Sequence, residues 1–190
     1  MFILAQEFLR ASKAIRDVNA SPGMTKKDAM PHANVLVHAM CLEILLKCLY
    51  VLDRHKPPAR RHNLKEIFES LLPETQKKIR EYFDPTEGQM FLDHVKAQHR
   101  GRVLWNAPVK FNFDYAIFAC SKTFEWVRYA YERDQGPTEQ WVGTPLVDAT
   151  HKLILERRPQ WASITSGLRP MDVYIPSTSR SHLMRKLPEK

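Results

Sequence analysis

Residues 32–52 read HANVLVHAMCLEILLKCLYVL and determine the architecture that we expect of the whole chain. Apolar side chains occupy nearly every face of a helix drawn through this stretch, which is typical of the central helix of a bundle. Its apolar character is broken by His38, Glu43 and Lys47. These polar residues indicate that residues 31–53 form a buried helix of a soluble protein rather than a membrane span. We therefore expect no membrane association.

Amphipathic patterns elsewhere in the chain predict further helices around this central one. The first apolar stripe is formed by residues three or four apart: Leu4, Phe8, Ala11, Ile15 and Val18. Periodicity, an N-cap at Asn63 and prolines at segment ends predict more helices over 64–72, 73–83, 87–97, 113–134 and 145–158. We therefore predict an all-α, up-and-down bundle of five to seven helices over residues 1–158.

The composition and the absence of common sequence motifs argue against several classes of enzyme. The chain has 190 residues, a formal net charge of +8 and only 6 glycines. It contains none of the patterns GxGxxG, GxxxxGK(S/T), HExxH and CxxC, so we expect no cofactor and no metal. Its three cysteines, Cys41, Cys48 and Cys120, lie in apolar helical patterns and resemble small buried hydrophobes. Their odd number and the lack of a secretion signal predict a cytoplasmic protein without disulfides.

Much of the positive charge is concentrated in residues 54–65, 94–110 and 159–190. The last of these segments has no sustained periodicity. We expect it to form an irregular basic extension, ordered only where Trp161, Leu168 or Tyr174 docks on the bundle. The charge balance permits a phosphate-bearing partner.

The first basic cluster precedes the helix predicted over 64–72. Arg60, Arg61 and His62 stand just before its N-terminus, where guanidinium groups and free backbone N–H groups attract anions. The sequence therefore predicts a phosphate-binding site here. The alternative is a histidine that caps or packs locally at the start of the helix.

The second basic cluster contains His94, His99, Arg100 and Arg102, with Trp105 and Phe111 interleaved. No acid occurs from His94 to Val109. Charge combined with stacking aromatics is typical of single-stranded nucleic-acid surfaces, and Arg102 is a candidate phosphate contact. If the chain cleaves RNA, His99 with Arg100 is the best catalytic pair, because His exchanges protons near neutral pH. The alternative is a solvated loop whose aromatic residues enter the core.

A structural polar network is predicted inside the bundle. Glu43 and Lys47 are four residues apart in the favourable order for an ion pair. Arg128 and Glu132 lie on the predicted helix over 113–134, and we expect Glu43, Arg128 and Glu132 to tie the two helices together. We interpret this network as architectural rather than catalytic.

Three segments together resemble the HEPN-domain family of all-α proteins. The central stretch resembles its long second helix, with an E-x-x-L-K pattern at Glu43, Leu46 and Lys47. RHNLKEIFESLLP at 61–73 resembles a motif that follows a short basic loop, and FEWVRYAYE at 124–132 resembles a late aromatic run. The family implies a homodimer, RNA binding or metal-independent ribonuclease activity, and a role in toxin–antitoxin or phage-defence systems.

One family signature is missing from this chain. The ribonuclease motif of the family is Arg-x(4–6)-His, and no histidine here has an arginine five to seven positions before it. The leading hypothesis is therefore a non-catalytic protein that binds RNA or a nucleotide. The alternatives are a pure protein-interaction module, which would bind an antitoxin or defence component, and a metal-independent endoribonuclease.

Overall fold

The central stretch forms helix α2, Pro31–Arg54, in the computed structural model, which describes residues 1–19, 21, 31–98, 110–121 and 143–162. Within these ranges the regular elements are all helices, and no strand occurs. The other helices are α1 (Phe2–Asn19), α3 (Leu64–Glu69), α4 (Pro73–Tyr82), α5 (Thr86–Gln98), α6 (Phe113–Cys120) and α8 (Thr144–Arg157). The prediction of an all-α protein is confirmed for this part of the chain.

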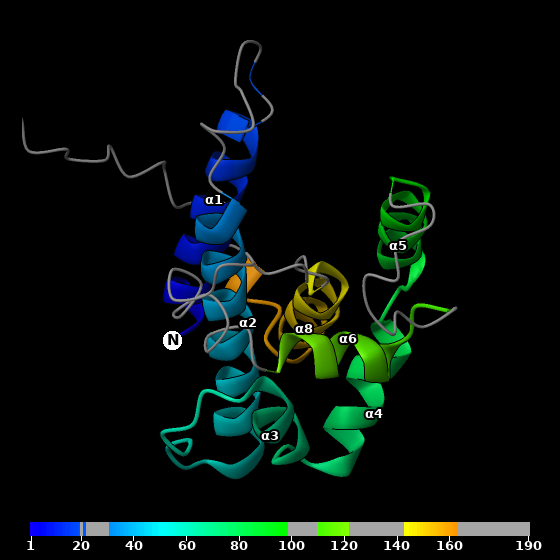
Figure 1. Ribbon diagram of the computed structural model, residues 1–190. Coiled ribbons are helices and arrows are strands. Elements are labelled where there is room, and N and C mark those ends of the chain that lie inside the picture. Colours follow the sequence, from blue (N-terminus) through cyan, green and yellow to red (C-terminus); the bar gives the residue numbers. More distant parts are fainter. Residues whose placement is uncertain (20, 22–30, 99–109, 122–142, 163–190) are drawn as a thin grey trace, which may run out of the picture.

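Helix α2 is the centre of the packing, as its sequence predicts. Figure 1 shows α1 lying along α2 and α3 lying across the lower end of α2. Helices α4 and α5 lie on the opposite side of the picture from α1. Helix α8 packs against both α2 and α4, and α3 packs against both α2 and α6. Four leucines of α2 are among the most deeply buried core residues: Leu42, Leu45, Leu46 and Leu49.

Helices α1 and α2 are also joined by a buried polar contact. The hydroxyl of Ser12 donates to Asn34 Oδ1 at 2.7 Å and lies 2.8 Å from His38 Nδ1. Both Ser12 and His38 are buried, so this contact satisfies polar groups that the apolar interface would otherwise leave unpaired.

Helix α6 ends earlier than the periodicity predicts. The sequence suggests a helix from Phe113 to Asp134, but α6 ends at Cys120. The backbone N–H of Ser121 donates to the carbonyl of Phe118, and the Ser121 hydroxyl donates to the same oxygen at 2.6 Å. Such local bonds of serine compete with the regular helical ladder. The rest of the predicted helix lies outside the described residues.

Trp161, which we expected to dock on the bundle, packs against α1. Its ring centroid is 5.0 Å from that of Phe2, and Phe2 also stacks on His151 of α8 at 5.7 Å. Residues 163–190, which include Leu168 and Tyr174, lie outside the described residues.

One stretch of the described residues, Ala33–Arg54, is long and apolar enough to cross a membrane. Half of its apolar window is buried inside the protein. The core helix of a soluble bundle has the same length and composition, so the expectation of no membrane association stays a prediction.

Candidate nucleic-acid interface

The basic connector, residues 54–65, begins where α2 is forced to end. His55 adopts a left-handed conformation with φ of 52°, and its N–H closes the last turn on the carbonyl of Val51 at 2.9 Å. A left-handed residue is a common helix terminator. Pro57 and Pro58 follow and cannot donate to a helical ladder, so the chain leaves the helix as an exposed loop.

Near the end of the connector, Asn63 is the predicted N-cap of α3. Its side-chain oxygen accepts from the backbone N–H groups of Lys65 at 3.1 Å and Glu66 at 3.3 Å. The N-cap prediction is therefore confirmed. The carboxylate of Glu66 lies 3.3 Å from Arg61 Nη1, which ties the end of the connector to the first turn of α3.

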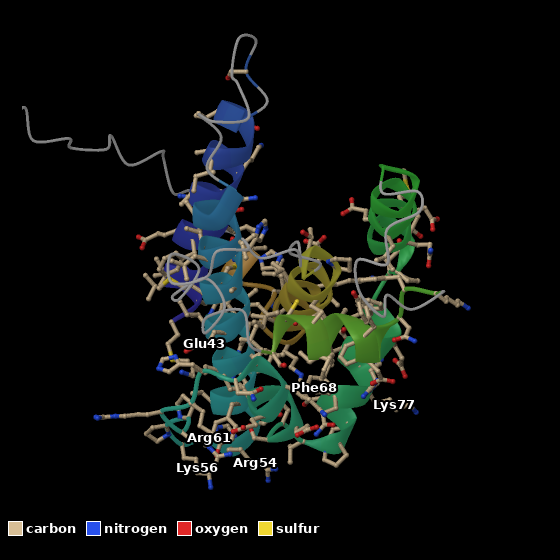
Figure 2. All side chains as sticks on the ribbon, in the orientation of Figure 1. Glu43, Arg54, Lys56, Arg61, Phe68 and Lys77 are labelled. Carbon is tan, nitrogen blue, oxygen red and sulfur yellow. The ribbon has the colours of Figure 1, made fainter. Side chains whose placement is uncertain are left out.

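The connector carries a concentrated and exposed positive charge. It contains no acidic residue, and its basic side chains are all exposed: Arg54, His55, Lys56, Arg60, Arg61, His62 and Lys65. Figure 2 shows Arg54, Lys56 and Arg61 at the same end of the protein, away from Lys77 on α4.

Acidic neighbours neutralise only part of this charge. Arg61 pairs with Glu66, and Lys65 lies 3.7 Å from Glu69, with all four side chains largely exposed. Among the described residues, Arg54, Lys56 and Arg60 have no carboxylate partner. The run of basic residues without an acid is the sequence signal that also points to Arg54, Lys56 and Lys65, beyond the predicted Arg60, Arg61 and His62.

The predicted pair of Glu43 and Lys47 is present and has a third member. Lys47 Nζ lies 2.6 Å from Glu43 Oε1, and His62 Nδ1 lies 3.1 Å from Glu43 Oε2. Glu43 is buried, whereas the His62 side chain is 73% exposed. His62, predicted as a phosphate contact, is thus placed between a buried carboxylate and the solvent-facing connector.

The remaining predicted site residues cannot be placed relative to this cluster. His99, Arg100 and Arg102 lie outside the described residues, and so do Arg128 and Glu132. The structure therefore brings together Glu43, Lys47 and His62. The catalytic pair and the link to Arg128 and Glu132 stay predictions.

A second polar cluster was not predicted from the sequence. Asp53 Oδ1 lies 2.6 Å from Arg157 Nη1 and accepts from the Thr75 hydroxyl, while Asp53 Oδ2 accepts from the backbone N–H of Leu72. Arg157 also donates to the Thr75 hydroxyl oxygen at 2.6 Å. This cluster joins α2, α4 and α8 and is structural, because the Asp53 side chain is only 2% exposed.

The cysteines are free and buried, as predicted. Burial raises the pKa of Cys41 to about 12 and that of Cys48 to about 11, so both stay thiols at neutral pH. In the described part of the chain, no group of three His, Cys, Asp or Glu side chains is arranged to hold a metal ion.

The fold and the connector define a helical protein with a basic surface at one end. Comparison of the chain with protein-family models, with curated proteins and with solved structures finds no match in any of the three.

Proposed function

We propose that this chain is a non-catalytic, HEPN-like protein that binds RNA through the basic connector. The observation that carries the proposal is the exposed run of five Lys and Arg residues between 54 and 65 without an acid. Lysine and arginine side chains that keep their charge exposed neutralise phosphates and release counterions, which drives nucleic-acid binding. The proposal includes a cytoplasmic homodimer that acts in a toxin–antitoxin or phage-defence system.

The resemblance to the family supports the proposal through the same residues. Glu43 and Lys47 of the E-x-x-L-K pattern form a buried ion pair, and the segment that begins at Arg61 meets this pair through His62. A polar pair in the central helix thus positions the loop that carries the charge. The two segments that resemble the family, residues 32–52 and 61–73, are therefore in contact through Glu43 and His62.

The non-catalytic part of the proposal rests on the missing Arg-x(4–6)-His signature and on the position of His62. Its Nδ1 faces Glu43 rather than an arginine of the connector. We assign Arg60 and Arg61 to phosphate contacts and His62 to positioning. If the chain is instead a ribonuclease, His99 and Arg100 remain the best candidates.

A protein-interaction module is the second candidate function. Phe118 of α6 is 66% exposed, and Met90 of α5 is 68% exposed. Large exposed apolar side chains favour a protein partner over a nucleic acid. Binding that is indifferent to salt but lost on Phe118→Ser would support this candidate.

The test measures the affinity of the full chain for a fluorescent single-stranded RNA between about 50 and 200 mM salt. We expect Arg60→Ala/Arg61→Ala to weaken binding and to reduce the slope of log K against log salt by about 1.4, for two lost phosphate contacts. The matched control is Lys77→Ala/Lys78→Ala, which removes the same charge from exposed positions of α4.

Two outcomes would contradict the proposal. If both double variants weaken RNA binding equally, the connector contributes only through the net charge of the protein and is not a specific RNA interface. Cleavage of total RNA that is lost on His99→Ala but kept on His38→Ala would show that the chain is a metal-independent ribonuclease.

A further inference from the structure

An apolar cavity of about 390 Å³ opens between the first turn of α1 and the last turns of α2. Its walls are formed by Phe2, Ile3, Cys48, Val51, Leu52 and Trp161, with Met1 beside them. Met1 and Ile3 are 53% and 49% exposed, so they line the mouth of the cavity rather than its floor. A dry apolar cavity of about 150 Å³ is enough to hold benzene. This cavity therefore accepts a considerably larger apolar group.

The side chains in the walls of the cavity are uncharged and well supported, and the N-terminal ammonium of Met1 lies near enough to Cys48 to act on its thiol. Phe2 is 5% exposed and is held between the rings of His151 and Trp161. Cys48 is 4% exposed, and because burial raises the pKa of its thiol to about 11, it stays neutral. A ligand inside this cavity meets carbon and thiol groups but few hydrogen-bonding partners.

Two cations follow the cavity-lining residues of α2. Val51 and Leu52 line the cavity, and Arg54 stands two residues after Leu52, a rise of roughly 3 Å along the helix axis, with its Nη2 3.5 Å from the carbonyl oxygen of Ser70 at the end of α3. Lys56 comes two residues later, and both cations are exposed without a carboxylate partner in the described part of the chain. Figure 2 shows both at the end of α2.

The neighbouring acid, Asp53, does not cancel this charge. Its side chain is 2% exposed and is paired with Arg157 of α8. The end of α2 that lines the cavity thus carries exposed cations, while the side chains that line the cavity are apolar.

The geometry points to a binding site for an anionic amphiphile, with its apolar chain in the cavity and its acidic head at Arg54 and Lys56. With about 30 Å³ for a water-sized group, the cavity holds about a dozen such groups, which corresponds to a medium-length acyl chain. A nucleobase fits less well, because its hydrogen-bonding edges would lose water without gaining partners. This site shares Arg54 and Lys56 with the basic connector, but the binding of an amphiphile does not require that the connector binds RNA.

The test titrates the full chain with decanoate, with decanol and with decyltrimethylammonium, and follows the heat of binding. We expect saturable binding of one decanoate per chain. Arg54→Ala/Lys56→Ala should weaken decanoate roughly five- to tenfold and leave decanol unchanged, because only the head contact is lost. The cationic amphiphile should bind most weakly.

Three further variants distinguish the contribution of the cavity from that of the charge. Val51→Trp fills the cavity and should abolish binding of both decanoate and decanol, with helical content and melting temperature measured to confirm folding. Lys77→Ala/Lys78→Ala removes equal charge elsewhere and should leave decanoate binding unchanged. Arg60→Ala/Arg61→Ala should also leave it unchanged, so that loss of RNA binding in this variant is distinguished from loss of the amphiphile site.

Three outcomes would overturn the site. They are decanoate affinity that Arg54→Ala/Lys56→Ala leaves intact, uptake of many decanoate molecules per chain, and no binding at all. The site would also be overturned if the chain forms a dimer and decanoate dissociates that dimer, because a second copy of the chain would then be the occupant of the cavity.

Discussion

His62 Nδ1 lies 3.1 Å from a carboxylate oxygen of Glu43, although 19 residues separate the two in the sequence. The contact joins the exposed connector to the core helix of the protein. The other oxygen of Glu43 lies 2.6 Å from Lys47 on the next turn of α2. Of the polar residues that interrupt the apolar helix, Glu43 therefore holds the basic connector through His62.

Replacing Glu43 by Gln should destabilise the fold. The amide keeps the shape of the side chain but removes the charge that faces Lys47, whose side chain is 16% exposed, and His62. A half-buried ammonium without its carboxylate costs about 2 kcal/mol. For a chain of this size we expect the melting temperature to fall by roughly 6 °C in scanning calorimetry.

The matched control for this change is Glu66→Gln. Glu66 also pairs with a cation, but both its side chain and that of Arg61 are largely exposed. Exposed pairs contribute little, so we expect a change within about 0.5 kcal/mol. Equal melting temperatures for the two variants would contradict a stabilising contribution of the buried carboxylate.

The sequence predicts those parts of the site that depend on near neighbours. The pair of Glu43 and Lys47 follows from helical spacing, and the cap at Asn63 follows from its place before an apolar periodic segment. The contact of His62 with Glu43 depends on how the connector folds back, which no local pattern specifies. Asp53 and Arg157 are 104 residues apart and meet only through the packing of α8 on α2.

Arg157→Met should destabilise the protein more than Glu43→Gln does. It keeps much of the packing of the arginine stem but leaves the carboxylate of Asp53 buried without its cation. Removing one partner of a buried pair costs about 3 kcal/mol, or roughly 10 °C in melting temperature here. Urea unfolding measures the loss directly.

A double-mutant cycle tests the origin of that loss. Asp53→Asn/Arg157→Met should cost less than the sum of the single changes, because the second removes the charge that the first leaves unpaired. Arg158→Met, at the next and exposed position, should be nearly neutral. Strictly additive losses would show that the two side chains do not stabilise each other.

The stability of the protein should depend on pH through His151. Burial lowers the pKa of His151, whose Nε2 has no hydrogen-bond partner among the described residues and whose ring stacks on Phe2. The unfolded chain therefore takes up this proton at a higher pH than the folded chain. The contribution of His151 to stability is present above its unfolded pKa and is lost as the pH falls through its folded pKa.

His151→Phe keeps an aromatic ring against Phe2 and removes the titration. We expect the loss of unfolding free energy between about pH 7.5 and pH 5 to be smaller in this variant than in the unmodified chain. His55→Gln, at an exposed position, serves as the control and should leave the pH dependence unchanged. If His151→Phe and the unmodified chain show the same dependence of unfolding free energy on pH, groups other than His151 cause the loss of stability in acid.

Gly88→Ala should create a clash between α5 and the segment that leads into α6. A Cβ atom at this position would lie 2.1 Å from Cε1 of the Phe111 ring. That ring cannot easily move, because Phe111 is 1% exposed and packs between Phe83 and Tyr115. Overpacking costs about 1–3 kcal/mol, against about 1 kcal/mol gained when alanine replaces glycine in a helix. We expect a net loss of stability in urea unfolding.

Phe111→Leu provides the compensating change. In the unmodified chain it removes buried aromatic packing and should be destabilising. Combined with Gly88→Ala it makes room for the new methyl group, so its cost should be smaller than in the unmodified chain. If Phe111→Leu costs the same in both backgrounds, the methyl group does not meet the ring, and the glycine is not required by this close approach.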